Sequence, residues 1–175
     1  MRITDVEVND FSAYPKRIMQ FGEGNFLRAF ADYFIQLANE KGIINSSVVL
    51  IKPTERSVNP VFFEQNCRYN VFLRGRYNGS VVDACKTITC VSEILNAYSD
   101  FEKVLELAKS PELQVFISNT TEAGIEFRES DTLSAAPNVT YPAKLTALLY
   151  ERFKALGADG KLLILPLELI ENNGT

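Results

Sequence analysis

The sequence predicts an α/β fold in which a doubly wound, mainly parallel sheet carries a β-hairpin insertion. Three observations favour this fold. Short apolar runs alternate with stretches of helical periodicity, the first run passes through a pair of glycines into a helix, and a turn dipeptide divides a segment of alternating polarity. With 175 residues, 46% of them hydrophobic, the chain is large enough to bury one core, and we treat residues 1–175 as one domain.

The N-terminal part predicts a strand, a turn, a helix and a second strand in that order. Residues 17–22, "RIMQFG", form a short buried strand, and residues 47–53, "SVVLIKP", form another that ends at proline. Residues 25–42 between them predict an amphipathic helix that Gly42 ends. The apolar residues of this helix recur at helical spacing: Phe26, Phe30, Phe34 and Leu37. Continuous apolar strands joined by a helix are typical of a parallel sheet that is covered on both faces.

The middle of the chain departs from this pattern. Residues 68–91 alternate in polarity around Asn78 and Gly79, a dipeptide that suits a type I′ turn, so they predict an antiparallel hairpin. Residues 93–110 then predict a helix. Three further elements complete the predicted fold: a strand at 113–119, a helix at 141–157 and a last strand at 161–170.

Composition and charge exclude several classes of function. The net charge of -4 offers no broad basic surface, so we expect no nucleic-acid partner. No apolar run approaches the roughly 18 residues of a membrane span, so we expect no membrane partner and a cytoplasmic protein. The chain has no histidine, which excludes Ser-His and Cys-His catalysis within it. Cys67, Cys85 and Cys90 lack metal-site spacing, and we expect buried or partly buried thiols and no metal.

The first strand runs into Gly22, Glu23 and Gly24, directly before the predicted helix. Ligands of doubly wound folds bind at the carboxyl ends of the strands, and a bare turn lets a diphosphate approach the N–H groups that open a helix. The turn therefore predicts a Rossmann-type dinucleotide site, although Leu27 stands where the usual fingerprint has a third glycine. Arg28 is either a further positive charge near phosphates or substrate, or a solvated helix residue. A glycine turn without a ligand is the alternative.

The second strand ends without the acid that usually binds the adenosine ribose of NAD. Lys52 stands at the strand end, and Glu55 is the nearest acid. Lys52 and Arg56 are suited instead to attract the 2′-phosphate of NADP. These residues leave the choice between NAD and NADP open.

A polar cluster follows the strand at 113–119. Asn119, Thr120, Thr121 and Glu122 stand at its carboxyl end, where we expect them to line a nicotinamide pocket and touch substrate. The alternative is structural, with a threonine capping the following turn and Gly124 supplying a positive φ.

Four segments together resemble the mannitol dehydrogenase family of polyol-specific long-chain dehydrogenases: "RIMQFGEGNFLRAFADYFIQLANEKGIINSSVVLIKP", "SNTTEAGI", "YPAKLTALLYERF" and "PLELIENNG". The resemblance covers nearly the whole chain. The family's G-x-G-x-F-x-R pattern falls on Gly22, Gly24, Phe26 and Arg28, with Asn25 between the second glycine and the phenylalanine. The resemblance therefore adds Asn25 and Phe26 to the predicted cofactor-binding residues and implies that the cofactor is NAD.

The resemblance also implies a second, mostly helical domain that carries the catalytic lysine. Because the chain stops after a strand, we expect residues 1–175 to be the N-terminal part of a longer protein, with the missing C-terminal domain as a partner. The family's acid-asparagine-x-x-x-asparagine-glycine stretch begins at Glu168 here. Leu169 replaces its first asparagine, which leaves Asn173 as the candidate for stabilising an oxyanion.

The implied reaction is reversible reduction of a sugar acid, D-tagaturonate, to D-altronate with NADH, in hexuronate breakdown. Residues 1–175 alone are expected to bind the cofactor weakly and to lack reductase activity. Two alternatives remain open: reduction of fructuronate or fructose, as in other members of the family, and a Rossmann-like module that binds a nucleotide or adenosyl cofactor without redox chemistry.

Overall fold

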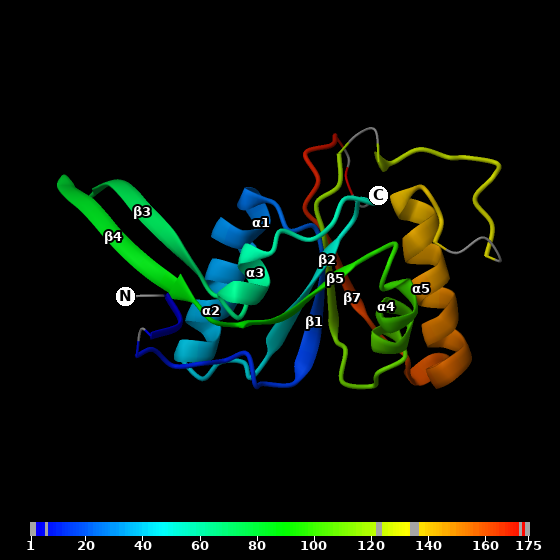
Figure 1. Ribbon diagram of the computed structural model, residues 1–175, viewed down its shortest axis with the longest axis horizontal. Helices are drawn as coiled ribbons and strands as arrows, with labels where there is room; N and C mark the ends of the chain where they lie inside the picture. The colour runs from blue at the N-terminus through cyan, green and yellow to red at the C-terminus, as the bar shows by residue number, and fades with distance from the viewer. Residues whose placement is uncertain (1–2, 6, 122–123, 134–136, 172, 174–175) are drawn as a thin grey trace.

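A five-stranded parallel sheet forms the centre of the molecule, and a separate two-stranded hairpin extends from it (Figure 1). The computed structural model describes residues 3–5, 7–121, 124–133, 137–171 and 173. In chain order the elements are η1 (Ile3–Asp5), β1 (Lys16–Phe21), α1 (Asn25–Ala29), α2 (Ala31–Glu40), β2 (Ser47–Lys52), α3 (Val61–Glu64), β3 (Tyr69–Tyr77), β4 (Ser80–Ile88), β5 (Val91–Asn96), α4 (Phe101–Ala108), β6 (Val115–Ser118), α5 (Tyr141–Leu156), η3 (Gly157–Asp159) and β7 (Leu163–Pro166).

The strands of the central sheet lie in the order β5-β2-β1-β6-β7, and every neighbouring pair is parallel. The chain builds outward from β1 through β2 to β5 on one side and through β6 to β7 on the other. Phe21 pairs with Ile51 of β2 and with Ser118 of β6, so the carboxyl ends of these three strands meet at one edge. The predicted doubly wound, mainly parallel sheet is confirmed, and its order reverses between β1 and β6.

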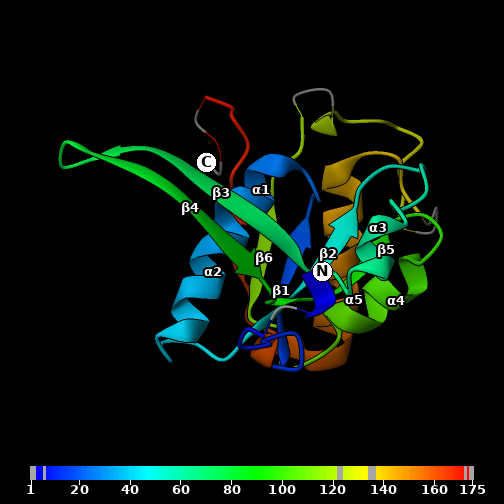
Figure 2. The same cartoon turned by 60° about the vertical axis from the view of Figure 1, so that its left-hand side comes forward.

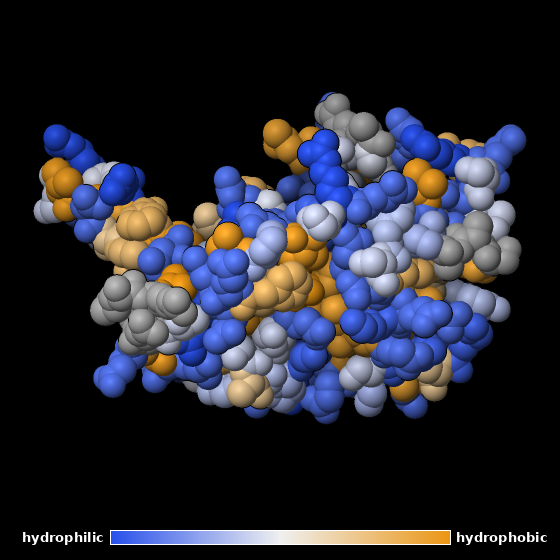
Figure 3. All heavy atoms as spheres, viewed as in Figure 1, coloured by the Kyte–Doolittle hydropathy of each residue, from blue (hydrophilic) through white to orange (hydrophobic). Residues whose placement is uncertain are grey.

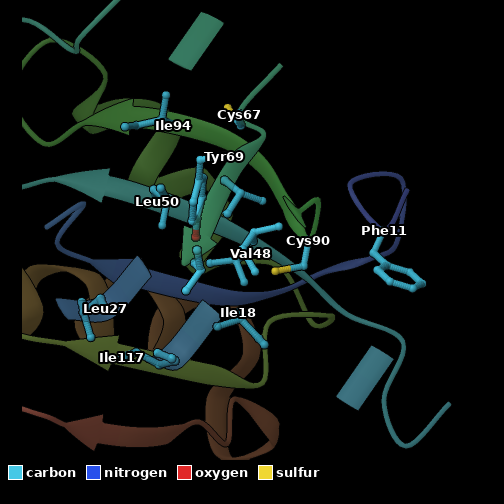
Figure 4. Close-up of a cluster of buried hydrophobic side chains, with 14 residues drawn as sticks. Phe11, Ile18, Leu27, Val48, Leu50, Cys67, Tyr69, Cys90, Ile94 and Ile117 are labelled. Atoms are coloured by element: carbon cyan, nitrogen blue, oxygen red, sulfur yellow. The ribbon is translucent and has the colours of Figure 1, made fainter. Parts of the chain in front are cut away.

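Helices cover both faces of the sheet, which explains its continuous apolar strands (Figure 2). Alternate residues of β2 point to opposite sides. Val48 and Leu50 belong to a buried cluster with Leu27 of α1, and Figure 4 shows this cluster over the sheet. Val49 and Ile51 belong to a second cluster, which includes residues of α4 and α5. The two clusters together hold the sheet between α1–α2 and α4–α5.

The hairpin β3–β4 confirms the predicted turn. Asn78 and Gly79 have φ angles of 49° and 81°, the left-handed conformations that a type I′ turn requires. Figures 1 and 2 show the hairpin extending away from the sheet. Cys85 lies on it and is exposed, so the expectation of three buried or partly buried thiols is wrong there, whereas Cys67 and Cys90 are buried.

The helix predicted for residues 93–110 is wrong over its first part. Ile94 and Leu95 belong to β5 and pair in parallel with Leu50 and Ile51 of β2. The side chain of Asn96 then accepts a hydrogen bond from the N–H of Tyr98, which turns the chain, and α4 begins only at Phe101. Two adjacent apolar residues fit a buried strand as well as a helix, and pairing with β2 decides between them.

The predicted helix after the glycine turn bends at Phe30, although its hydrogen bonds continue from Phe30 N to Phe26 O and from Phe34 N to Phe30 O. Its polar Asp32 and Gln36 are buried, whereas Phe26, Phe30 and Phe34 are each about half exposed. The rings of Phe26 and Phe30 stack with centroids 5.4 Å apart, and the ring of Phe34 meets that of Phe30 edge to face at 5.2 Å. We call them the aromatic stripe.

Candidate functional site

The first glycine of the turn is required by its backbone and by its surroundings. Gly22 follows β1 with a φ of +126°, a conformation that other residues rarely adopt. A Cβ atom added there would lie 3.1 Å from Cδ1 of Leu27 and 3.6 Å from the carbonyl oxygen of Asn119. Leu27 is 1% exposed, so it occupies core space beside Gly22. This contact explains how the turn packs against its helix without the third glycine of the usual fingerprint.

The second glycine, Gly24, is required neither by its backbone angles nor by its protein neighbours. Gly24 has ordinary extended angles, φ -67° and ψ 163°, and a Cβ atom added there would meet no heavy atom within 4 Å. Its backbone therefore faces open space at the start of α1. A diphosphate fits such a turn, because its oxygens approach backbone N–H groups that carry no side chain in front of them.

Arg28 stabilises the glycine turn through hydrogen bonds of its guanidinium group. Its Nε donates to the carbonyl oxygen of Glu23 at 2.9 Å, and its Nη2 donates to Oδ1 of Asn25 at 2.6 Å. Its guanidinium lies 5.4 and 5.3 Å from the ring centroids of Phe62 and Tyr69. These contacts fix the shape of the turn through a side chain that starts one helical turn later. Direct contact between Arg28 and a bound phosphate stays a prediction.

Two buried polar residues support the turn from the core. Gln20 is fully buried in β1, and its Nε2 donates to the carbonyl oxygen of Gly22 at 3.2 Å. Asp32 is fully buried on α2 and accepts a hydrogen bond of 2.6 Å from the hydroxyl of Tyr69. Burial raises the pKa of Asp32 to about 7, although hydrogen bonds from Tyr69 and Gln20 and the charge of Arg28 act in the opposite direction.

Sequence reasoning missed both of these supporting residues. The signal available was a glutamine inside the apolar run "RIMQF" and an aspartate on the side of the helix opposite the aromatic stripe. Each is a polar residue at a position that the strand or helix pattern places against the core.

The end of β2 lies beside the glycine turn. Lys52 forms an ion pair with Glu23, and both side chains are largely buried. A cavity of about 320 Å³ opens here and is lined in part by Glu23, Arg28, Lys52, Arg56 and Asn59. The predicted residues of the turn and of β2 are therefore brought together. Glu55, the acid nearest to the strand end in sequence, is exposed and does not line this cavity.

The polar residues after β6 contact the segment that follows β7. Nδ2 of Asn119 donates to the carbonyl oxygen of Leu167 at 2.7 Å, and the N–H of Thr120 donates to Oε1 of Glu168 at 3.2 Å. Thr121 is exposed at the same edge of the sheet. Glu122 lies outside the described residues. Asn119 also adjoins Gly22, as noted above, so the two predicted clusters are neighbours.

Asn173 is placed by hydrogen bonds within the same segment. Its Nδ2 lies 3.0 Å from the carbonyl oxygens of Pro166 and Glu168 and 3.2 Å from Oε2 of Glu168. Leu169, which replaces an asparagine of the family pattern, is 96% exposed. The amide hydrogens of Asn173 face oxygens of its own chain, and its role at an oxyanion stays a prediction.

Two other kinds of site are absent from the part of the chain that the structure describes. Within the residues that the structure describes, no group of three or more His, Cys, Asp or Glu side chains is placed to hold a metal ion. Among the same residues, no helix has both the length and the apolar character needed to cross a membrane.

Comparisons with known proteins agree with this geometry. Residues 16–175 match the family model described as the mannitol dehydrogenase Rossmann domain. The altronate oxidoreductase of Phocaeicola vulgatus is 48% identical over 162 residues, covering 91% of this chain and 34% of that protein. An altronate oxidoreductase of Escherichia coli is 46% identical over 164 residues, covering 92% and 34%. The chain thus spans about a third of the length of these relatives.

Two solved structures share the fold. A substrate-free D-sorbitol dehydrogenase superposes with a TM-score of 0.73 at 20% identity, covering 94% of this chain and 36% of that one. A ternary complex of Pseudomonas fluorescens mannitol 2-dehydrogenase with NAD and D-mannitol superposes with a TM-score of 0.76 at 17% identity, covering 95% and 36%. From the family match and these relatives, the chain belongs to the mannitol dehydrogenase family, and residues 16–175 form its Rossmann domain.

Proposed function

We propose that this chain is the NAD-binding domain of an oxidoreductase that interconverts D-tagaturonate and D-altronate. The observation that supports cofactor binding best is the open backbone of Gly24, at the edge of the sheet where the strand order reverses. The names of the curated relatives, altronate oxidoreductases at 45–48% identity, support the substrate.

Different residues of the chain are proposed to bind the three parts of the dinucleotide. The turn from Gly22 to Asn25 receives the diphosphate, and Arg28 keeps that turn in shape. The adenosine half extends toward β2 and Lys52, and the nicotinamide half toward Asn119, Thr120 and Thr121, because the two halves of a dinucleotide lie on either side of the point where the strand order reverses. When bound, NADH supplies the hydride that reduces the keto carbon of the sugar acid.

Proton transfer is proposed to use a lysine outside residues 1–175, as the family resemblance implies. Asn173, at the end of the segment after β7, is proposed to donate its amide to the developing alkoxide. In this proposal the segment exchanges the hydrogen bonds that Asn173 now makes to Pro166 and Glu168 for contacts with substrate.

The aromatic stripe is proposed to contact the rest of a polypeptide of the relatives' length. Phe26, Phe30 and Phe34 expose about half of their surface side by side, and Leu163 and Leu165 of the edge strand β7 are exposed as well. Figure 3 shows apolar residues gathered along the middle of the face that is turned toward the viewer in Figure 1. Contiguous exposed aromatic residues of this kind mark surfaces that another protein segment covers.

A chimera tests the proposed reaction. Residues 16–175 replace the corresponding domain of the Phocaeicola vulgatus relative, and NADH oxidation is followed with D-tagaturonate, D-fructuronate and D-fructose. We expect tagaturonate to give the highest kcat/KM. A preference for another ketose would reject the substrate, and a folded chimera that binds no NADH would reject the function.

The same chimera tests the aromatic stripe. Phe34→Glu is expected to lower the Tm of the chimera, because the charge is buried against the second domain. In the 175-residue chain, where Phe34 is 54% exposed, the same substitution is expected to leave the Tm within about 2 °C. Equal effects in both proteins would contradict the proposed contact.

A further inference from the structure

The ion pair between Glu23 and Lys52 brings an acid to the end of β2, where the sequence of β2 itself has no acid. In Rossmann domains an acid at the end of the second strand hydrogen-bonds the ribose hydroxyls of NAD. Here the second strand ends in Lys52, and the acid that Lys52 contacts is Glu23, which belongs to the glycine turn. We infer that Glu23, held by Lys52, binds the adenosine ribose and selects NAD against NADP. This inference rests on the proposed function.

The strand register brings the two residues to the ribose side of the site. Phe21 and Ile51 are paired in β1 and β2, so the chain leaves both strands at the same height. Lys52 follows directly, and Glu23 follows after Gly22. Both side chains line the cavity of about 320 Å³ on the β2 side of the turn. The adenosine half of a dinucleotide extends to this side of the central strand.

The carboxylate of Glu23 has capacity left for a ligand. Lys52 contacts Oε1, and within the described residues no other group is recorded as donating to the Glu23 side chain. The side chain is 23% exposed, so it opens to the cavity without being freely solvated. A carboxylate accepts hydrogen bonds at two oxygens, which suits the two neighbouring hydroxyls of a ribose.

The cationic residues of the cavity offer little to a 2′-phosphate. Arg28 donates to the glycine turn and lies against two aromatic rings, and Lys52 is neutralised by Glu23. Arg56 is exposed at the rim. A 2′-phosphate would therefore stand beside the negative charge of Glu23, which repels it, and would have to break the ion pair to reach Lys52.

Calorimetric titration of the 175-residue chain with NADH and with NADPH tests this inference. We expect the wild-type chain to bind NADH at least about tenfold more tightly. Glu23→Gln is expected to weaken NADH binding about tenfold, through loss of charge-assisted hydrogen bonds, and to strengthen NADPH binding. Glu55→Gln is the matched control, because Glu55 is exposed outside the cavity, and it is expected to change neither affinity.

Lys52→Met provides an independent variant. It keeps the carboxylate and removes the cation that holds it, so we expect NADH binding to weaken about threefold and NADPH binding to weaken by more than that, because the charge of Glu23 is then unopposed. An unchanged ratio of NADH to NADPH affinity in a folded Glu23→Gln variant would overturn the inference while leaving the proposed function intact. A wild-type chain that bound neither cofactor would overturn the proposed function and the inference together.

Discussion

The two ends of the sheet edge where the cofactor is proposed to bind differ in what their polar groups contact. At the β1–β2 end, Gln20 and Arg28 donate to backbone oxygens of the glycine turn and leave the front of Gly24 open. At the β6–β7 end, Asn119 and Asn173 donate to carbonyl oxygens at the end of β7 and in the segment that follows it. The hydrogen bonds at the first end thus fix a turn whose front stays open, whereas those at the second end tie the segment after β7 to itself and to the end of β6.

The difference indicates how far each half of the site is preorganised. A turn whose shape is already fixed loses little entropy when a diphosphate binds. A segment whose amides already face its own oxygens has to exchange those hydrogen bonds before it meets a substrate. This contrast supports the proposal that residues 1–175 bind and orient the cofactor, and that proton transfer depends on residues outside them.

The largest predicted effect concerns the support beneath the β1–β2 end. Burial raises the pKa of Asp32 from 3.8 to about 7, so the folded protein favours the neutral acid. The free energy of unfolding should therefore fall as the pH rises from about 4 to about 7, by on the order of 4 kcal/mol from this group. Asp32→Asn should remove that part of the pH dependence. Urea unfolding at several pH values measures it.

The control for this prediction is the difference between the two proteins at each pH, because all other groups titrate in both. The variant should gain stability relative to wild type as the pH rises, with the gain complete slightly above pH 7. Parallel profiles would mean that Asp32 is charged in the folded protein throughout.

A smaller effect is predicted for the turn itself. Gly22→Ala forces alanine to a φ of +126° and places its Cβ against Leu27, so it should lower the free energy of unfolding by about 2 kcal/mol. Gly24→Ala is the matched control and should change it by less than about 0.5 kcal/mol, because its φ is ordinary and its surroundings are open. Thermal or urea unfolding measures both losses. Equal losses in the two variants would show that the backbone and surroundings of Gly22 constrain it no more than those of Gly24 do.

The smallest predicted effect tests the β6–β7 end. Thr121 is exposed beside Asn119, where the nicotinamide half is proposed to lie. Thr121→Val should weaken NADH binding about threefold through loss of one hydroxyl hydrogen bond. ADP-ribose, which lacks the nicotinamide, should bind both proteins equally. If the substitution weakened ADP-ribose binding as much as NADH binding, the nicotinamide would have to lie elsewhere.

Much of the fold could be predicted because its signals are local. The strand at β1, the glycine turn and the helix after it follow one another within 25 residues, and the turn at Asn78 and Gly79 needs no distant partner. Residues 93–96 could not be assigned in this way. Their strand depends on pairing with β2, some 45 residues earlier in the chain.

The candidate site likewise has features that local sequence predicts and features that depend on contacts between distant segments. The spacing of Gly22 and Gly24 predicts the turn from the sequence alone, because it reflects a requirement of the backbone. The pairing of Glu23 with Lys52 and the burial of Asp32 depend on which segments meet across the sheet edge. The aromatic stripe had the helical spacing of a core face, but the other side of the helix packs on the sheet, and only the structure distinguishes the two.

In the proposed function, the bare backbone at Gly24 is the place where the diphosphate of NAD approaches the chain. Calorimetric titration of NADH into wild type and Gly24→Ala tests this most directly, because the added methyl group meets no protein atom and occupies only the space in front of the turn. We predict equal stability and an affinity for NADH at least about tenfold lower in the variant. Equal affinity of the two proteins for NADH would mean that the diphosphate does not bind in front of Gly24.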